Sequence, residues 1–425
     1  MGTKNSSLKS TLSVGLTNML DSSCIVAGAT GLTLWASAFN LSNFQVGLLG
    51  ALSANAFGAA IGAIFGGRLS DKYGRKPIYT YDMLVYLIGT LIVTFSVNFV
   101  MLLLGFLVTG IAVGAGVPAT WTYVSETSGT TNRARNMGLT QFLWNLGLLL
   151  IYVLGAILSP LGLLGTRILF GILTVVAFIT WLLQRQLSES DEWLSQKRQE
   201  QTHHVEEHPY RQMFSNPVSV RSILFLAGVY VIWNLVASAM GFFMPYVYEV
   251  VGGLSHFESN LINIIPGILG LLATIFIFSL LADRVSHRLL FFIGAACGLV
   301  AWALLVFVGI NTKVGLWTFL IIWGIHGGIS AQCFYSLWST ELFPTQFRAA
   351  SQGFIFFLVR GFAGIWSICF PIILGSMGFV AAGSMMVAFL AISLLIGTIW
   401  APNTRGKSLD QITLERYGKE FVTKR

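Results

Sequence analysis

The chain has 425 residues, of which 55% are hydrophobic and only 10% carry a charged side chain. Its mean hydropathy is +0.75, a value that excludes a soluble enzyme or a soluble nucleic-acid-binding domain despite the net charge of +8. With about 20 apolar residues for each crossing of a bilayer, the length allows about twelve spans. We therefore predict an all-α polytopic membrane protein.

The apolar segments, taken in chain order, predict these twelve spans. They cover residues 10–38, 44–67, 77–97, 99–125, 135–158, 164–185, 221–247, 258–282, 289–309, 314–339, 349–375 and 378–400. No cleavage site follows the polar start of the chain, so we expect the first span to be kept rather than removed as a signal peptide. All four cysteines lie within apolar runs, which favours neither a disulfide framework nor a zinc site.

The basic residues lie in alternate loops. If the amino terminus is cytoplasmic, then of the 25 Lys and Arg residues only Arg167, Lys313 and Arg360 fall outside cytoplasmic segments. The positive-inside rule therefore places both termini in the cytoplasm. We expect a multi-pass protein of the inner (plasma) membrane, with the lipid bilayer as its surroundings.

One long polar stretch, residues 187–220, separates the sixth and seventh spans. It indicates an N-terminal six-helix bundle at 1–186, a cytoplasmic linker at 187–220, a C-terminal six-helix bundle at 221–401 and a cytoplasmic tail at 402–425. The histidines of the linker lack further ligands at regular spacing, so we predict solvated side chains and no metal site.

A dense charge cluster joins the second and third spans, with the sequence G-R-L-S-D-K-Y-G-R-K from Gly67 to Lys76. Its cations cannot remain in hydrocarbon, so the segment must reach water. Gly67 and Gly74 allow a tight turn or a close helix contact, and Asp71 can accept hydrogen bonds from a helix N-terminus or an arginine such as Arg75. A weaker copy, with Asp283 and Arg284, follows the eighth span.

A second internal repeat pairs an acid with a base seven residues later. Glu126 and Arg133 follow the fourth span, and Glu341 and Arg348 follow the tenth. Such groups at cytoplasmic helix ends can bridge two helices in one state and separate in another. We therefore predict that both pairs and both charged loops form a cytoplasmic gate.

These motifs resemble those of the major facilitator superfamily. The cluster at Gly67–Lys76 is similar to its G-x-L-a-D-r-x-G-R-K/R loop. The E-x6-R segments, together with P-N-T-R-G-K-S-L-D-Q-I from Pro402 and S-E-S-D-E-W-L from Ser188, are similar to segments of the sugar porters and the related organic anion and metabolite transporters. The resemblance implies two pseudo-symmetric six-helix bundles and transport by rocker-switch alternating access.

The resemblance also implies roles for single residues. Asp21 falls where proton-coupled sugar porters place a protonatable aspartate, and Gln141 falls where they place a sugar-binding glutamine. The arginine that these relatives place opposite the aspartate is Phe106 here. The hexose signature Q-Q-x-x-G-I-N of the seventh span is replaced by the sequence from Ile232 to Ser238.

Arg360 lies deep within the eleventh span. A guanidinium there costs several kcal/mol unless it faces a cavity or a partner, so it is a candidate functional residue. Organic anion transporters carry an arginine at the corresponding place, and a guanidinium suits a carboxylate or a sulfonate. The alternative is a structural arginine paired with Asp21 or with backbone carbonyl groups.

Further polar and aromatic side chains are candidates for the substrate site. Asn145 lies one turn from Gln141, which suits recognition of hydroxyl groups, although hydrogen bonding between helices would explain both residues. Tyr230, Trp233 and Asn234 could form an aromatic and polar wall, or could serve only packing. His326 could relay a proton, bind substrate or be a satisfied packing residue.

Asp82, about a turn and a half inside the third span, is expected to pair with the basic loop rather than to bind substrate.

The sequence as a whole predicts a secondary active transporter of a small hydroxylated organic anion, such as a sugar acid, a carboxylate or a sulfonate. Proton symport is the favoured coupling, with Asp21 as the proton site. The alternative cargo is a neutral sugar or polyol. A membrane receptor or enzyme is disfavoured because no nucleophile, metal or nucleotide motif appears, so we predict no enzymatic activity and no cofactor. We expect a monomer whose partners are the anionic solute and the proton.

Overall fold

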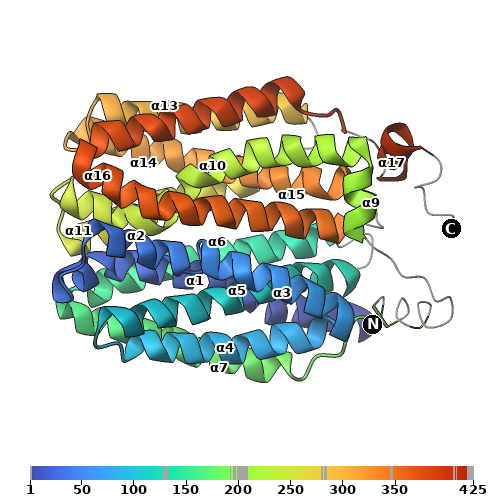
Figure 1. Ribbon diagram of the computed structural model, residues 1–425, viewed down its shortest axis with the longest axis horizontal. Coiled ribbons are helices and arrows are strands. Elements are labelled where there is room, and N and C mark those ends of the chain that lie inside the picture. Colours follow the sequence, from blue (N-terminus) through green and yellow to red (C-terminus); the bar gives the residue numbers. More distant parts are fainter. Residues whose placement is uncertain are drawn as a thin grey trace. The chain divides into compact units, whose positions relative to one another are not determined.

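The computed structural model describes residues 2–127, 133–191, 193, 194, 198, 209–278, 281, 285–344, 348–404, 407 and 409–418. Helices follow one another along this part of the chain, and no strand occurs among the described residues. The elements are α1 (Gly2–Ala38), α2 (Asn43–Leu52), α3 (Phe57–Tyr73), α4 (Arg75–Thr94), α5 (Phe99–Thr127), α6 (Arg133–Leu158), η1 (Ser159–Leu161), α7 (Leu163–Gln184), α9 (Pro209–Ser215), α10 (Pro217–Val250), α11 (His256–Ala273), η2 (Thr274–Phe278), α13 (His287–Phe307), α14 (Lys313–Gly328), α15 (Ala331–Glu341), α16 (Arg348–Trp400) and α17 (Leu409–Tyr417) (Figure 1). The all-α prediction is confirmed.

Eleven helical segments of the described chain are long and apolar enough to cross a bilayer. The last of them, Ser351–Trp400, has 50 residues, more than twice the about 20 that one crossing needs. It consists of two helices, because Gly378 interrupts α16 with φ of 81° and ψ of 176°, a conformation that glycine adopts without steric cost. The prediction of twelve spans is therefore confirmed, and the ends lie within a few residues of the predicted ones.

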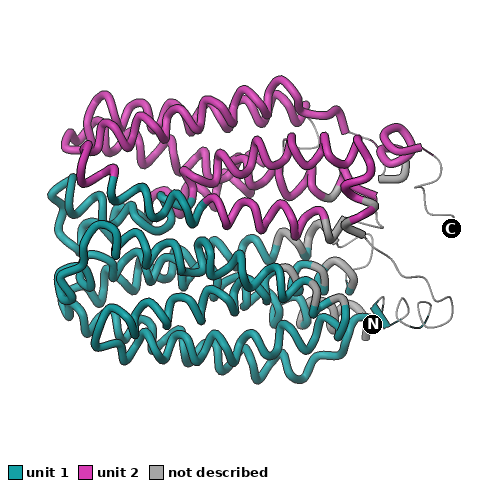
Figure 2. The backbone as a smooth tube through the Cα atoms, viewed as in Figure 1, with its two compact units in different colours: residues 1–206, 238–264, 363–372 teal, residues 207–237, 265–362, 373–425 magenta. Residues whose placement is uncertain are grey.

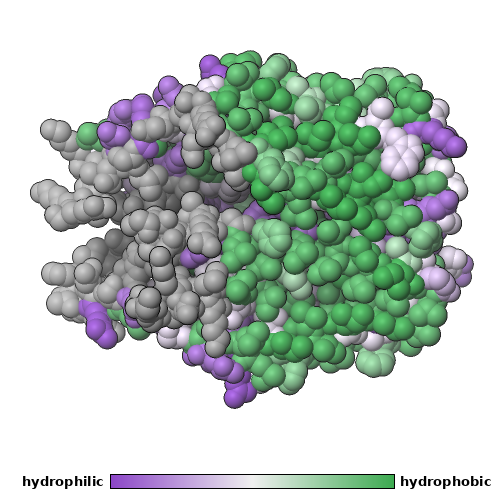
Figure 3. Space-filling view, turned by 180° about the vertical axis from the view of Figure 1, so that it is seen from behind, coloured by the Kyte–Doolittle hydropathy of each residue, from purple (hydrophilic) through white to green (hydrophobic). Residues whose placement is uncertain are grey.

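Large apolar side chains are exposed along the spans, as a lipid environment requires. Phe65 is 62% exposed, Ile88 53% and Leu224 67%. On the face shown in Figure 3, hydrophobic residues cover the spans and hydrophilic residues gather toward the helix ends. This distribution agrees with a multi-pass membrane protein.

Two compact units divide the described fold (Figure 2). Unit 1 comprises residues 1–206, 238–264 and 363–372, and unit 2 comprises residues 207–237, 265–362 and 373–425. Two long helices, α10 and α16, contribute to both units. The division into halves at the linker 187–220 stays a prediction, and part of the linker lies outside the described residues.

Aromatic side chains pack the later segments of unit 1 against its first helices. The ring of Phe242 on α10 lies 6.1 Å from that of Phe106 on α5, and Phe243 lies 5.4 Å from Phe370 on α16. A Cβ atom at Gly47 would lie only 2.8 Å from the carbonyl oxygen of Ser367. The helix ends remote from the loop at Gly67–Lys76 are thus closely packed within unit 1.

Three of the predicted spans are not continuous α-helices. The second is broken between α2 and α3, where the Ser53 hydroxyl donates to the Gly50 carbonyl and the Asn55 side-chain amide donates to the Ser238 carbonyl at 2.9 Å. The eighth contains the π-helical turn η2, and the tenth is broken between α14 and α15. Such interruptions within a membrane are tolerated where protein groups satisfy the backbone.

Small residues bring α3 and α5 into close contact. A Cβ atom at Gly62 would overlap the carbonyl oxygen of Ile111, and one at Gly114 would overlap that of Ala59. The glycines of the second and fourth spans thus allow the two helices to pack closely.

Candidate substrate and proton sites

Asp21 lies within α1 and faces α6. Its side chain is 2% exposed, and the indole Nε1 of Trp144 donates a hydrogen bond to its Oδ2 at 3.2 Å. The Ser22 hydroxyl donates to the carbonyl oxygen of Trp144 at 2.6 Å, which ties the two helices together at this level. Trp144 therefore supplies a neutral hydrogen-bond donor to this carboxyl group. Its role in proton coupling stays a prediction.

The side chains of Gln141 and Asn145 lie on the same side of α6 as Trp144. Both are half-buried, and neither amide has a hydrogen-bond partner in the part of the chain that the structure describes. Each amide carries both donors and an acceptor, which match the hydroxyl groups of a sugar or polyol. Recognition of hydroxyl groups by these two residues therefore remains a prediction that the structure leaves open.

Phe106 occupies the position where the resemblance would place an arginine. It is 1% exposed, and its ring contacts Trp35 edge-on at 5.6 Å and Phe170 at 6.0 Å. Gly28 on α1 leaves the space for this ring, since a Cβ atom there would lie 2.7 Å from Cε1 of Phe106. An arginine in this apolar cluster would lack the solvation that its charge requires.

Unit 2 contains a stack of aromatic rings from two helices. Tyr230 on α10 lies parallel to Tyr335 on α15, with centroids 4.0 Å apart and an interplanar angle of 6°, and it also stacks on Trp233 at 5.8 Å and 15°. Flat aromatic faces of this kind pack on the apolar face of a sugar ring. Tyr335 was not among the predicted residues, because only the tertiary fold brings α15 beside α10.

His326 on α14 holds this stack in place. Trp233 Nε1 donates to Nε2 of His326 at 3.0 Å, and Nδ1 lies 2.7 Å from the carbonyl oxygen of Gly294 on α13. Because Nε2 accepts, Nδ1 must carry the proton and donate to Gly294, which fixes the neutral tautomer. The side chain is 1% exposed and both ring nitrogens are engaged. In this conformation His326 therefore orients Trp233.

Asn234 and Arg360 are the remaining predicted binding residues of unit 2. Asn234 is 8% exposed, and its Oδ1 has no hydrogen-bond partner among the described residues. The Arg360 guanidinium lies over the ring of Phe356, one turn earlier in α16, with Cζ 5.0 Å from the centroid. Arg360 is half-buried. Its predicted anion binding and its alternative pairing with Asp21 both stay predictions.

The motif loop folds as the end of α3 and the start of α4. Gly74 has φ of 105°, and the carboxylate of Glu189 accepts hydrogen bonds from the backbone N–H of Arg75 at 3.1 Å and of Lys76 at 3.0 Å. Glu189 thus caps the N-terminus of α4, where an acid is favoured by the helix dipole. Arg75 is buried and donates to the Ser70 carbonyl at 2.9 Å. Gly67 lies in α3 with open space around it.

The side chains of most of the predicted gate residues are not described. Asp71, Glu126, Arg133 and Arg348 are described in their helical backbone only, and Asp283 and Arg284 are not described. Glu341 is described at the end of α15, where burial raises the pKa of its carboxyl group and a hydrogen bond with Thr404 opposes that shift. The gating role of all ten predicted residues stays a prediction.

A tail helix docks on the same end of unit 2. The Tyr417 hydroxyl on α17 donates to the Leu342 carbonyl at 2.8 Å, and the Arg416 guanidinium donates to the Ser222 hydroxyl at 2.7 Å. These contacts join α17 to the ends of α10 and α15.

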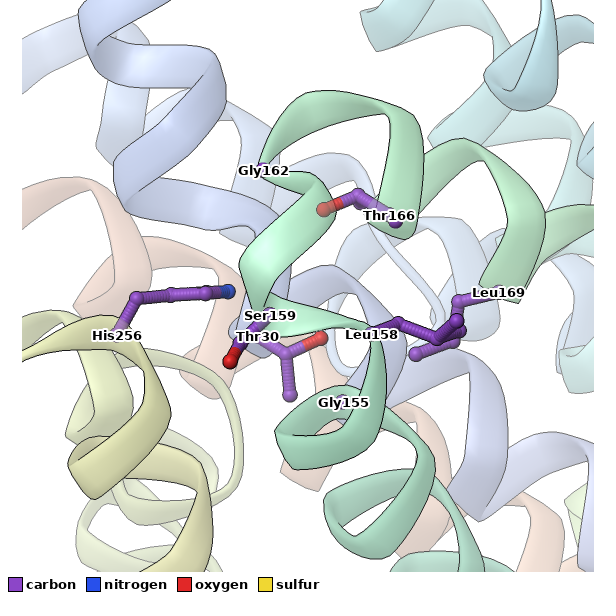
Figure 4. A pocket seen from close by; sticks show the side chains of 9 residues that line it. Thr30, Gly155, Leu158, Ser159, Gly162, Thr166, Leu169 and His256 are labelled. Atoms are coloured by element: carbon purple, nitrogen blue, oxygen red, sulfur yellow. The ribbon is translucent and has the colours of Figure 1, made fainter.

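A small pocket in unit 1 is too small for a sugar. Its volume is about 10 Å³, room for about one water molecule. Figure 4 shows Thr30, Ser159 and Thr166 lining it together with His256. It therefore carries no substrate-binding role.

The chain matches the family model described as Major Facilitator Superfamily over residues 11–368. The chain belongs to this superfamily. It is 42% identical over 415 residues to the minor myo-inositol transporter IolF of Bacillus subtilis (strain 168), covering 96% of this chain and 94% of the relative. It is also 30% identical over 146 residues to the arabinose-proton symporter of Escherichia coli (strain K12), covering 34% of this chain and 30% of that protein.

The fold is similar to the crystal structure of a D-xylose-proton symporter. The TM-score is 0.78 at 19% identity, with 94% of this chain and 99% of that chain covered. The family and the twelve-span architecture are therefore those predicted, and the chain is a multi-pass transporter of the sugar porter type. These relatives favour the alternative cargo, a sugar or polyol, over the predicted organic anion.

Proposed function

We propose that this transporter moves a neutral cyclitol, with myo-inositol as the first candidate, in symport with protons by alternating access across the plasma membrane, with both termini in the cytoplasm. The observation that carries the proposal is the 42% identity to the myo-inositol transporter IolF, which extends over 96% of the chain. Proton coupling is supported by the buried Asp21 and by the partial likeness to an arabinose-proton symporter.

The chemistry of the described side chains suits a neutral polyhydroxylated ring. Unit 1 offers the half-buried amides of Gln141 and Asn145. Unit 2 offers the amide of Asn234, the residue after Trp233, and the stack of Tyr230, Trp233 and Tyr335. Amides exchange hydrogen bonds with hydroxyl groups in both directions, and aromatic rings cover the C–H face of the ring. Arg360 would act as a further donor to hydroxyl groups.

Counterflow in proteoliposomes tests the cargo. Vesicles loaded with unlabelled myo-inositol should take up labelled myo-inositol, and external myo-inositol should compete better than glucuronate, a sugar acid. Arg360→Ala should reduce the rate of myo-inositol exchange without reversing this preference. If glucuronate is exchanged in preference and the preference disappears in Arg360→Ala, the cargo is the organic anion and Arg360 is its receptor.

Asp21→Asn separates coupling from binding. It should abolish accumulation driven by an imposed pH gradient while counterflow continues, because exchange needs no net proton movement. Accumulation by Asp21→Asn at the wild-type level would exclude Asp21 as the coupling residue.

A further inference from the structure

A second carboxyl group is buried in unit 1 with no ionic partner among the described side chains. Asp82 on α4 is 5% exposed, and neither of its carboxyl oxygens has a hydrogen-bond partner among the described residues. The expected pairing with the basic loop is not seen there, because the buried guanidinium of Arg75 donates instead to the Ser70 carbonyl. A charged carboxylate in such a place is strongly disfavoured, because nothing replaces the hydration that it loses on burial.

Asp82 faces a small polar cluster formed by four helices. A Cβ atom at Gly116 on α5 would overlap Oδ2 of Asp82 and would lie 3.3 Å from Cγ2 of Thr17 on α1. The Thr17 hydroxyl accepts a hydrogen bond from Nε2 of Gln184 on α7 at 2.8 Å. Oε1 of Gln184 has no partner among the described residues, although this side chain is fully buried. The cluster therefore contains an acid and an acceptor that are both unsatisfied.

The titratable side chains on the surrounding helices do not neutralise Asp82. Those described are Asp21 and Cys24 on α1, Lys72 and Tyr73 on α3, Tyr123 on α5, Arg167 and Arg185 at the two ends of α7, and Arg75, Lys76, Tyr79, Tyr81 and Tyr86 on α4 itself. Arg167 donates to the Ser96 carbonyl and Arg185 lies over Trp181. Lys72 is exposed over Tyr73. None of these described groups forms an ion pair with Asp82.

The cluster lies beside Asp21, and it is nearer than Asp21 to the helix ends that carry the Gly67–Lys76 loop. Thr17 precedes Asp21 by one turn of α1, and the hydroxyl of Tyr86, one turn beyond Asp82, donates to the Leu20 carbonyl at 2.9 Å. Asp82 follows the start of α4 by two turns, about 10 Å at 1.5 Å per residue. Asp21 lies deeper, about 16 Å beyond the start of its span at Ser10.

We propose that Asp82 is a second proton-binding site of the transport cycle, which receives the proton from Asp21 and releases it toward the cytoplasm. This inference rests on proton symport as part of the proposed function. In the transfer the O–H bond of the Asp21 carboxylic acid breaks and one forms on the Asp82 carboxylate, so one charge moves and none is created. Release to water then restores the Asp82 carboxylate.

Asp82→Asn tests the proposal in proteoliposomes, since it keeps the shape and removes the titration. The variant should lose myo-inositol accumulation driven by a pH gradient, and a pH-sensitive dye should show loss of the accompanying proton uptake, while counterflow persists. A packing role alone would leave both gradient-driven readouts unchanged. Asp191→Asn is the matched control, because Asp191 is an exposed acid just after α7, and it should behave as wild type.

Infrared difference spectroscopy between acid and alkaline pH gives a readout that needs no substrate. Wild-type protein should show a carboxylic acid C=O band that titrates and disappears in Asp82→Asn, or in the smaller Asp82→Ser if the asparagine variant does not fold. Wild-type accumulation by the folded variant, or the absence of such a band, would overturn the proposal. If wild-type protein neither exchanges nor accumulates myo-inositol, the proposed cargo fails, and the infrared band still decides whether Asp82 binds a proton.

Discussion

Replacement of His326 by phenylalanine should loosen unit 2 and weaken myo-inositol binding together. The change keeps a flat ring but leaves Trp233 Nε1 and the Gly294 carbonyl without the partners that they have at 3.0 and 2.7 Å. An unpaired buried polar group costs about 1–3 kcal/mol, and single hydrogen bonds between membrane helices average about 0.6 kcal/mol. We therefore expect His326→Phe to lower the free energy of unfolding by about 1–4 kcal/mol.

The functional consequence follows from the orientation of Trp233. Without its hydrogen bond the indole can rotate, and the stack with Tyr230 at 5.8 Å loses its fixed geometry. A loss of about 1.4 kcal/mol in binding corresponds to a tenfold weaker affinity for myo-inositol. Thermal unfolding in detergent, with and without myo-inositol, and counterflow at graded concentrations measure the two effects on the same preparations.

Two further variants make the test specific. His326→Gln can accept from Trp233 and donate to Gly294, so it should recover part of both losses. Trp323→Phe changes a ring that contacts His326 at 4.6 Å without removing either hydrogen bond, and it should retain wild-type affinity. A His326→Phe protein with wild-type stability and wild-type affinity would refute the reasoning.

Three other predictions concern packing and charge. Gly74→Ala should reduce the yield of folded protein and its thermal stability, because φ is 105° and a Cβ atom would overlap Oε2 of Glu189. Gly67→Ala is the control, because Gly67 belongs to the same motif but has open space around it. Equal loss in both variants would contradict the structure. Gly62→Val should separate α3 from α5 and lower stability by about 1–3 kcal/mol, whereas Gly171→Val, with nothing within 4 Å, should not; unfolding midpoints compare the two. Burial raises the pKa of Glu341 above its ordinary value of 4.5, so the contribution of this residue to stability is full below pH 4.5 and is lost as the pH rises through the raised pKa. Glu341→Gln should flatten this pH dependence and stabilise the protein at neutral pH. An unchanged pH profile of thermal unfolding in the variant would count against the shift.

The twelve spans and the family could be predicted from the sequence because both depend on local patterns. A run of about 20 apolar residues must form a helix in hydrocarbon whatever it packs against. The charged loop at Gly67–Lys76 must reach water for the same reason. The cargo was predicted less well, since a single arginine such as Arg360 has the same sequence context whether it binds an anion, donates to hydroxyl groups or supports the fold.

The sequence alone determined that the chain crosses the membrane twelve times and which residue types are too costly to bury without a reason, among them Asp21, Asp82 and Arg360. Only the tertiary structure decided which groups contact one another. Trp144 donates to Asp21, Trp233 donates to His326, Tyr335 stacks on Tyr230, and no described cation pairs with Asp82. The physical reason is that the cost of burying a polar group is a property of the residue and its span, whereas the compensating contact comes from another helix many residues away. Sequence spacing does not encode which helices become neighbours.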